Sequence, residues 1–98
     1  MLLIRDVFQI DPDSMREAKN VVRQMLSSES GIEVARPRFM TDLVGDYFTL
    51  VLEFEVPDLA SYETTFRDIM SNDSWRASYE RFRPMILGGH REIFQIEE

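Results

Sequence analysis

The sequence has no cysteine and only one histidine among its 98 residues. The lack of cysteine excludes disulfides, thiolate catalysis and zinc–thiolate sites. A lone histidine would leave mostly carboxylates to complete a set of metal ligands, and no glycine-rich phosphate loop is present. We therefore expect neither a bound metal nor another cofactor.

Basic residues are scarce as well. Eleven lysines and arginines stand against 18 acidic residues, a net charge of −7. This balance has the wrong sign for neutralising phosphates, so we expect no nucleic-acid partner. Long apolar runs are also missing: no stretch approaches the roughly 20 residues that a membrane-spanning helix needs, so we expect no membrane partner.

The opening segment MLLIRDVFQID carries an aspartate and has no small-residue cleavage site. We therefore do not expect it to be a signal peptide. A chain of this length corresponds to one domain, which we expect to span residues 1–98. A cytoplasmic location is the default expectation.

Hydrophobic periodicity predicts strands over Leu2–Ile10, Ile32–Thr41 and Tyr47–Val56, where apolar and polar residues alternate. A helix is expected after the first strand, because Asp11 can cap it and apolar residues then recur at helical spacing. Gly31 is well placed to end this helix. These patterns predict a strand, a helix and a hairpin in the first 56 residues.

The second half repeats the alternation. The segment PDLASYETTFRDIM has helical spacing and a candidate cap at Asp58, and Asp73 can cap a further short helix that ends near Pro84. Gly88 and Gly89 then lead into a last strand, GGHREIFQI. The order strand, helix, strand, strand, helix, strand is that of the ferredoxin-like α+β fold, with a four-stranded antiparallel sheet and both helices on one face.

Two further expectations concern the sheet. Parity across the hairpin puts Arg36 and Arg38 on the face of Glu53 and Glu55, which supports that register, and Pro37 requires an edge strand or a bulge. The face without helices is mixed rather than fully polar; it holds Leu3, Val7, Tyr47 and Val51. Such a face is best covered by a second sheet, so we expect a homodimer that packs through its sheet faces.

The stretches RFMTDLVGDYFTLVLEFEV, DLASYETTFRDIMSNDSWRASYERFRPMI and GGHREIFQI resemble NIPSNAP-like members of the dimeric α+β barrel superfamily. The resemblance covers about the last sixty positions. It implies the ferredoxin-like fold and a dimer. It implies an activity only weakly, since the superfamily includes cofactor-free monooxygenases, haem-degrading monooxygenases, isomerases and proteins without an assigned activity.

Asp6 interrupts the apolar face of the first strand. A buried carboxylate must be hydrogen-bonded, paired or protonated, so Asp6 is either a candidate catalytic base in a cavity or the partner of an arginine. His90 is the second candidate for a catalytic role. If the last strand lies beside the first, Asp6 and His90 could reach one cavity; the alternative is an exposed strand end.

Four aromatic residues are candidates for ligand binding: Trp75, Tyr79, Phe94 and Tyr47. Large aromatics at helical spacing are more often plain core residues. The leading interpretation is a small-molecule-binding protein or cofactor-free enzyme, of monooxygenase or isomerase type, with an apolar pocket for an apolar or aromatic molecule. The alternative is a non-catalytic dimerisation or interaction module whose core is filled. Haem binding through His90 is a third reading.

Overall fold

The computed structural model describes residues 1–27 and 34–97. Strand β1 (Leu2–Ile10) is followed by a 3₁₀ turn, η1 (Pro12–Ser14), and helix α1 (Met15–Leu26). Strands β2 (Ala35–Thr41) and β3 (Thr49–Val56) form the hairpin. Helices α2 (Leu59–Ser71) and α3 (Asp73–Phe82), a turn η3 (Arg83–Met85) and strand β4 (Ile86–Gln95) complete the chain.

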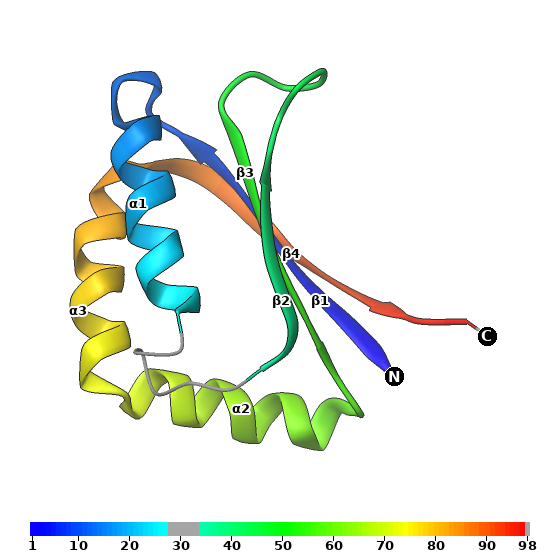
Figure 1. Ribbon diagram of the computed structural model, residues 1–98. Helices are drawn as coiled ribbons and strands as arrows, with labels where there is room; N and C mark the ends of the chain where they lie inside the picture. Colours follow the sequence, from blue (N-terminus) through cyan, green and yellow to red (C-terminus); the bar gives the residue numbers. More distant parts are fainter. Residues whose placement is uncertain (28–33, 98) are drawn as a thin grey trace.

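The four strands form one antiparallel sheet in the order β2-β3-β1-β4. All helices lie on one side of this sheet, and the opposite side faces away from them (Figure 1). This is the ferredoxin-like α+β arrangement, so the predicted fold class is confirmed. Among the described residues, no helix is both long and apolar enough to cross a membrane.

The core lies between α1, α3 and the sheet. The apolar stripe of α1 is buried there because its residues recur at helical spacing and so share one face. The main buried cluster consists of Ile10, Ala18, Val21, Val22, Met25, Leu50 and Phe82. A second cluster, Ile4, Phe54 and Val56, lies further along the same face of the sheet.

The hairpin has the predicted register. Arg38 lies opposite Glu53 in the ladder, and the pairing shifts between Ala35 and Arg38. Pro37 lies in this bulge, on the edge strand, as its missing N–H requires. Strand β3 starts later than predicted because Phe48 has a positive φ of 58°, which keeps it in the turn.

Two predicted caps are wrong and one is confirmed. The Asp58 side chain accepts a hydrogen bond from the N–H of Ser61, as expected for α2. At α3 the cap is Asn72, not Asp73, because Asn72 has the extended backbone that aims its side chain at the N–H of Trp75. Asp11 makes no cap bond; its carboxylate accepts from the Ser14 hydroxyl. The cap predicted at residue 31 lies outside the described residues.

Candidate functional site

A cavity of about 470 Å³ lies between the sheet and the helices. Its size is within the range of small-molecule sites in proteins, roughly 300–1,000 Å³. Most of the side chains that line it are apolar or aromatic. Those from the sheet include Ile4, Phe8, Leu52 and Phe54, and those from the helices include Met25, Phe66, Ile69, Trp75, Tyr79 and Phe82.

The strand and helix periodicities aim these side chains inward. Alternate residues of β1 and β3 face the helices, so they form the floor of the cavity. On α3, Trp75 and Tyr79 are four residues apart and therefore stack, with ring centroids 5.1 Å apart. Phe8 and Phe82 meet edge to face at 5.1 Å and join strand to helix. The aromatic walls are thus also part of the core.

One corner of the cavity is polar, and it is built from Asp6, Tyr62 and Arg91. The Nε of Arg91 donates to Oδ1 of Asp6 at 2.5 Å, and Nη1 donates to the Tyr62 hydroxyl at 2.6 Å. The guanidinium also lies 5.2 Å from the centre of the Phe66 ring. We call these three residues the polar corner.

The polar corner contains an ion pair between Arg91 and Asp6. Burial acts to lower the pKa of Arg91, but its hydrogen bond to Asp6 and the charge of that carboxylate outweigh burial and hold the pKa above its ordinary value. The Asp6 side chain is only 14% exposed, so it needs this partner. Asp6 was considered either as a catalytic base or as the partner of an arginine, and the structure provides that arginine.

The other predicted site residues divide between the two faces of the sheet. Trp75 and Tyr79 line the cavity with Asp6, as expected. His90 lies opposite Val7 in the ladder, whereas the partner of Asp6 is Arg91. The expectation that Asp6 and His90 reach one cavity is therefore wrong, because neighbouring residues of a strand point to opposite faces.

Phe94 and Tyr47 also lie outside the cavity. Phe94 pairs with Leu3 and shares the open face with His90, since both are even positions of β4 beyond its bulge. Tyr47 lies in the hairpin turn before β3 and its residue surface is 84% exposed. Neither is among the residues that line the cavity.

Arg91 and Phe66 were not among the site residues predicted from the sequence. Arg91 directly follows His90; an arginine partner was one of the two alternatives for Asp6, with no particular arginine named. The β1–β4 register determines which residue of β4 lies beside Asp6. This register could have been found only by testing each pairing of the two strands. Phe66 was predicted as a helix residue, and its contact with Arg91 depends on the same register.

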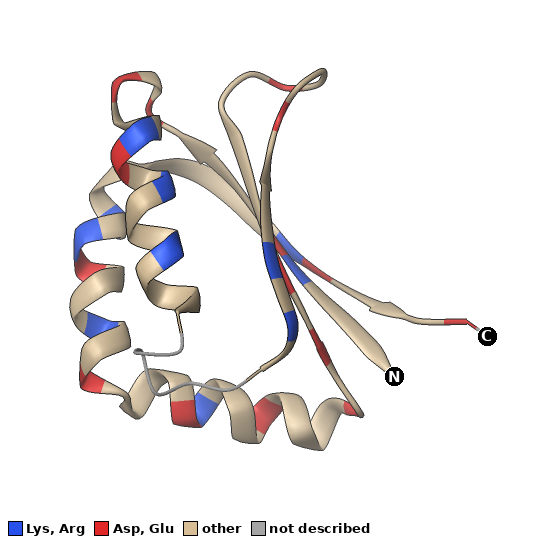
Figure 2. Cartoon of the chain, viewed as in Figure 1, with Lys and Arg blue, Asp and Glu red and all other residues tan. Residues whose placement is uncertain are grey.

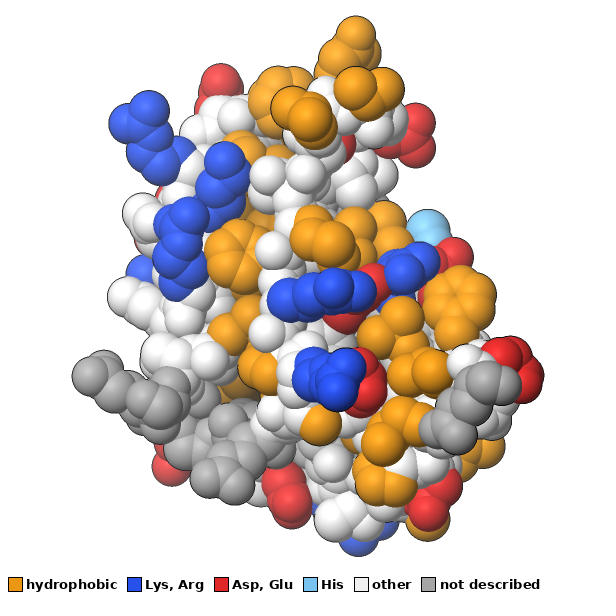
Figure 3. Space-filling view, turned by 45° about the vertical axis from the view of Figure 1, so that its right-hand side comes forward, with side chains coloured by type: hydrophobic (Ala, Val, Ile, Leu, Met, Phe, Trp, Pro, Cys, Tyr) orange, Lys and Arg blue, Asp and Glu red, His pale blue; other side chains and the backbone are white. Residues whose placement is uncertain are grey.

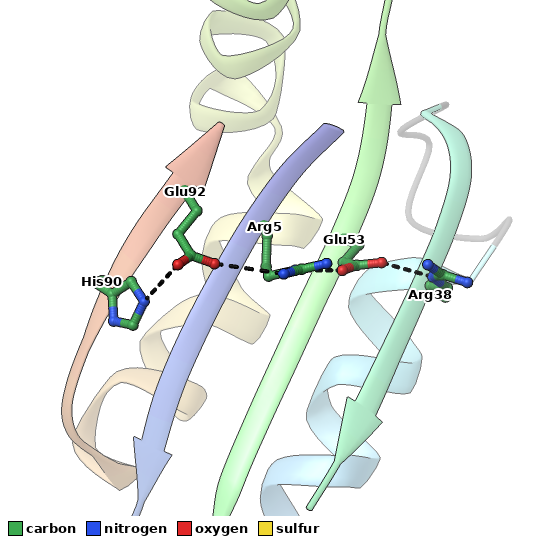
Figure 4. Close-up of polar contacts among 5 residues, drawn as sticks. All are labelled: Arg5, Arg38, Glu53, His90 and Glu92. Carbon is green, nitrogen blue, oxygen red and sulfur yellow. Dashed lines mark hydrogen bonds and ion pairs between the residues drawn. The ribbon is translucent and has the colours of Figure 1, made fainter. Parts of the chain in front are cut away.

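The open face carries a row of polar contacts across all four strands, which we call the charge ladder (Figure 4). Its charges alternate from Arg38 through Glu53 and Arg5 to Glu92, and it ends at His90, which contacts Glu92. Figure 2 shows the basic and acidic residues side by side in the middle of the sheet. In Figure 3, hydrophobic side chains lie on either side of this band, with the histidine at one end. The open face is therefore mixed, as predicted.

Glu53 is the centre of the ladder and is 1% exposed. Its two carboxylate oxygens accept from Nε of Arg5 at 2.5 Å and from Nε of Arg38 at 2.7 Å. Burial acts to raise the pKa of Glu53, but the two arginines together outweigh it and lower the pKa below its ordinary value. Arg36, which was predicted to share a face with Glu53 and Glu55, lies 3.9 Å from Glu55.

No cluster of three or more His, Cys, Asp or Glu that could hold a metal occurs in residues 1–27 and 34–97. Haem held through His90 does not fit this cavity either. The imidazole lies on the opposite face of the sheet, 60% exposed and 3.4 Å from Glu92. The cavity itself is lined by no histidine.

No protein-family model and no curated protein matches this sequence. Solved structures do match its fold. A NIPSNAP domain protein from Burkholderia xenovorans superposes with a TM-score of 0.85 at 15% identity, over 99% of this chain and 95% of that one. A NIPSNAP family protein from Agrobacterium tumefaciens gives 0.83 at 13% identity, over 99% and 86%.

A third similar structure is described as an antibiotic biosynthesis monooxygenase. It gives a TM-score of 0.77 at 13% identity, over the whole of both chains. The resemblance stated from the sequence motifs is thus confirmed at the level of the fold. At these identities the likeness establishes the fold alone.

Proposed function

We propose that this chain, which has the fold of NIPSNAP family proteins, binds a small apolar or aromatic molecule in the cavity between its sheet and helices. The observation that carries this proposal is the cavity of about 470 Å³, apolar except for the polar corner. A few convergent polar groups in an apolar pocket are the usual composition of a ligand site. The rival reading, a module with a filled core, is disfavoured by the same volume.

A cofactor-free enzyme of monooxygenase or isomerase type is the second candidate. One observation favours it: among the described residues, Oδ2 of Asp6 has no hydrogen-bond partner, while Oδ1 is held by Arg91. A carboxylate oxygen that is fixed in place and free to accept a proton is the geometry of a general base. One protein of this fold is described as a monooxygenase, which is consistent with this candidate.

We also propose that the protein is a homodimer whose sheets pack through the open face. Leu3, Val7 and Val51 lie on the same face as the charge ladder and are only partly buried there. Two sheets pack face to face at about 10 Å, and a twofold axis would place each ladder against the other. Native mass spectrometry should then give twice the chain mass, and Val51→Arg should give monomers; a wild-type monomer would refute the dimer.

Ligand binding can be tested with N-phenyl-1-naphthylamine, an uncharged fluorescent probe whose emission rises in apolar sites. Leu52→Phe adds bulk inside the cavity, and Leu43→Phe makes the same change at a hairpin position that is 97% exposed. With the probe in the cavity, the larger side chain of Leu52→Phe would overpack the site, at a cost of about 1–3 kcal/mol. This variant should therefore weaken probe binding about tenfold or more. Leu43→Phe should bind like the wild type.

The result that would overturn the proposal is equal binding by the two variants and the wild type. In that case the probe would be on the exposed surface rather than in the cavity. If the probe does not bind to the wild type at all, the alternative of a non-catalytic module with a filled core would be favoured.

A further inference from the structure

The charges around the cavity cancel. Asp6 and Arg91 are the charged side chains among the described residues that line it, and they form an ion pair at 2.5 Å. A guanidinium is protonated at neutral pH, so Arg91 carries its positive charge next to Asp6. The arginine therefore offers hydrogen bonds to a ligand without an unbalanced positive charge.

The polar corner still has unused hydrogen-bonding capacity. Arg91 uses Nε for Asp6 and Nη1 for Tyr62, and no partner for Nη2 occurs in the described part of the chain. Asp6 has Oδ2 left as an acceptor. Nη2 and Oδ2 belong to the two partners of one ion pair, whose Nε and Oδ1 are in contact, so the pair offers both a donor and an acceptor. Such a pair complements a hydroxyl group, since a hydroxyl both donates and accepts.

We infer that Asp6 sets the charge selectivity of the cavity, so that the site takes an uncharged ligand with a hydroxyl group and rejects a carboxylate. This inference rests on the proposed function and names the ligand class for the same cavity. The hydroxyl donates to Oδ2 of Asp6 and accepts from Nη2 of Arg91.

A carboxylate is disfavoured for two physical reasons. It has no proton to donate to Oδ2, so two acceptors would face each other, and like charges at contact distance repel. The carboxylate also loses its hydration when it enters an apolar cavity. Arg91 does not offset this cost, because Asp6 already balances the charge of Arg91. A ligand without any polar group leaves the corner's donor and acceptor without new partners, which disfavours it less strongly.

The test uses three probes with one naphthalene ring system, so that only the head group changes: 1-naphthol, 1-naphthoate and naphthalene. Each is measured by its displacement of bound N-phenyl-1-naphthylamine at pH 7. The wild type is expected to bind 1-naphthol about tenfold more tightly than 1-naphthoate, with naphthalene between them. This comparison needs no variant, so it does not depend on any substitution folding.

The variant Asp6→Asn keeps the shape of the side chain and removes its charge. The amide oxygen can still accept from Nε of Arg91, but Arg91 is no longer neutralised and the second position becomes a donor. We expect Asp6→Asn to reverse the order of the two probes and bind 1-naphthoate more tightly than 1-naphthol. A reversed order distinguishes selectivity from a general loss of structure, because damage would weaken both probes.

Glu92→Gln is the matched control. It removes one negative charge from the neighbouring strand, but Glu92 lies on the open face with Arg5 and His90. It should leave the preference for 1-naphthol unchanged. The inference is overturned if wild type binds 1-naphthoate as tightly as 1-naphthol, or if Asp6→Asn and Glu92→Gln behave alike. Failure of N-phenyl-1-naphthylamine to bind at all would instead refute the proposed function.

Discussion

Glu53 gives a quantitative test of the charge ladder. The substitution Glu53→Gln keeps the size of the side chain but replaces one acceptor oxygen with a donor. Glu53 uses both oxygens, one for Nε of Arg5 and one for Nε of Arg38. Glutamine can satisfy only one of them, and its NH₂ group then faces the other guanidinium as a second donor.

The magnitude follows from these two bonds. A hydrogen bond to a charged group contributes about 1.5–3 kcal/mol. The loss is reduced here because the arginine side chains are 34% and 65% exposed and can rehydrate. We expect Glu53→Gln to lower the free energy of unfolding by about 2 kcal/mol, which for a domain of this size lowers Tm by roughly 10 °C.

Glu55→Gln is the control on the same face of β3. Glu55 pairs with Arg36 at 3.9 Å, and the Arg36 side chain is 83% exposed, so the pair contributes at most about 1 kcal/mol. Thermal unfolding followed by circular dichroism should separate the two variants clearly. Equal Tm values for Glu53→Gln and Glu55→Gln would refute the view that the ladder centre is a stabilising buried interaction.

The contribution of Glu53 also depends on pH with a definite sign. Its pKa in the folded protein is lowered, so the stabilisation is fully present above the ordinary value of 4.5 and is lost as pH falls below that value toward the folded pKa. The Tm difference between wild type and Glu53→Gln should therefore be constant from pH 6 to pH 7 and shrink as the solution is acidified below pH 4.5. A difference that grows on acidification would contradict the assignment.

The remaining predictions concern β4. A Cβ at Gly89 would clash with the carbonyl oxygen of Val7, whereas one at Gly88 would meet nothing within 4 Å. Gly89→Ala should thus lower the unfolding free energy by about 1–3 kcal/mol and Gly88→Ala should change it little, as chemical denaturation can measure; similar values would refute the close approach. His90→Ala should leave probe affinity unchanged, because the imidazole contacts Glu92 on the open face; an affinity loss on titration would contradict this placement.

Much of the fold could be predicted because its determinants are local. The alternation over Leu2–Ile10 and the helical spacing of α1 each depend on neighbouring residues only, and both elements are where they were predicted. The β2–β3 register was also predictable, since a short hairpin brings Arg38 and Glu53 together and opposite charges support that pairing. Helix ends were less accurate by one residue, as Asn72 shows, because several polar residues there can serve as caps.

The candidate site could be predicted only in part. Its helix residues, Trp75 and Tyr79, follow from the spacing of α3. The pairing of β1 with β4 does not follow from any local pattern, because it joins distant residues, such as Asp6 and Arg91 at 85 positions apart, and the register shifts near Ile10. A slip of one residue exchanges the faces, so His90 was expected where Arg91 is found.

The cavity itself was also beyond a sequence pattern. The cavity volume is the small difference between the space enclosed by sheet and helices and the volume of the side chains that fill this space. The spacing of Phe66 and Ile69 on α2 fits a filled core equally well. Only the three-dimensional arrangement separates these cases.

The most direct measurement for the central claim is where a bound molecule lies. Nuclear Overhauser contacts between the ring protons of 1-naphthol and the methyl groups of the protein would locate it. We expect contacts to Leu52 and Ile69, which line the cavity, and none to Val7 and Val51 on the open face. Contacts to Val7 and Val51 without contacts to Leu52 and Ile69 would contradict the cavity as the binding site.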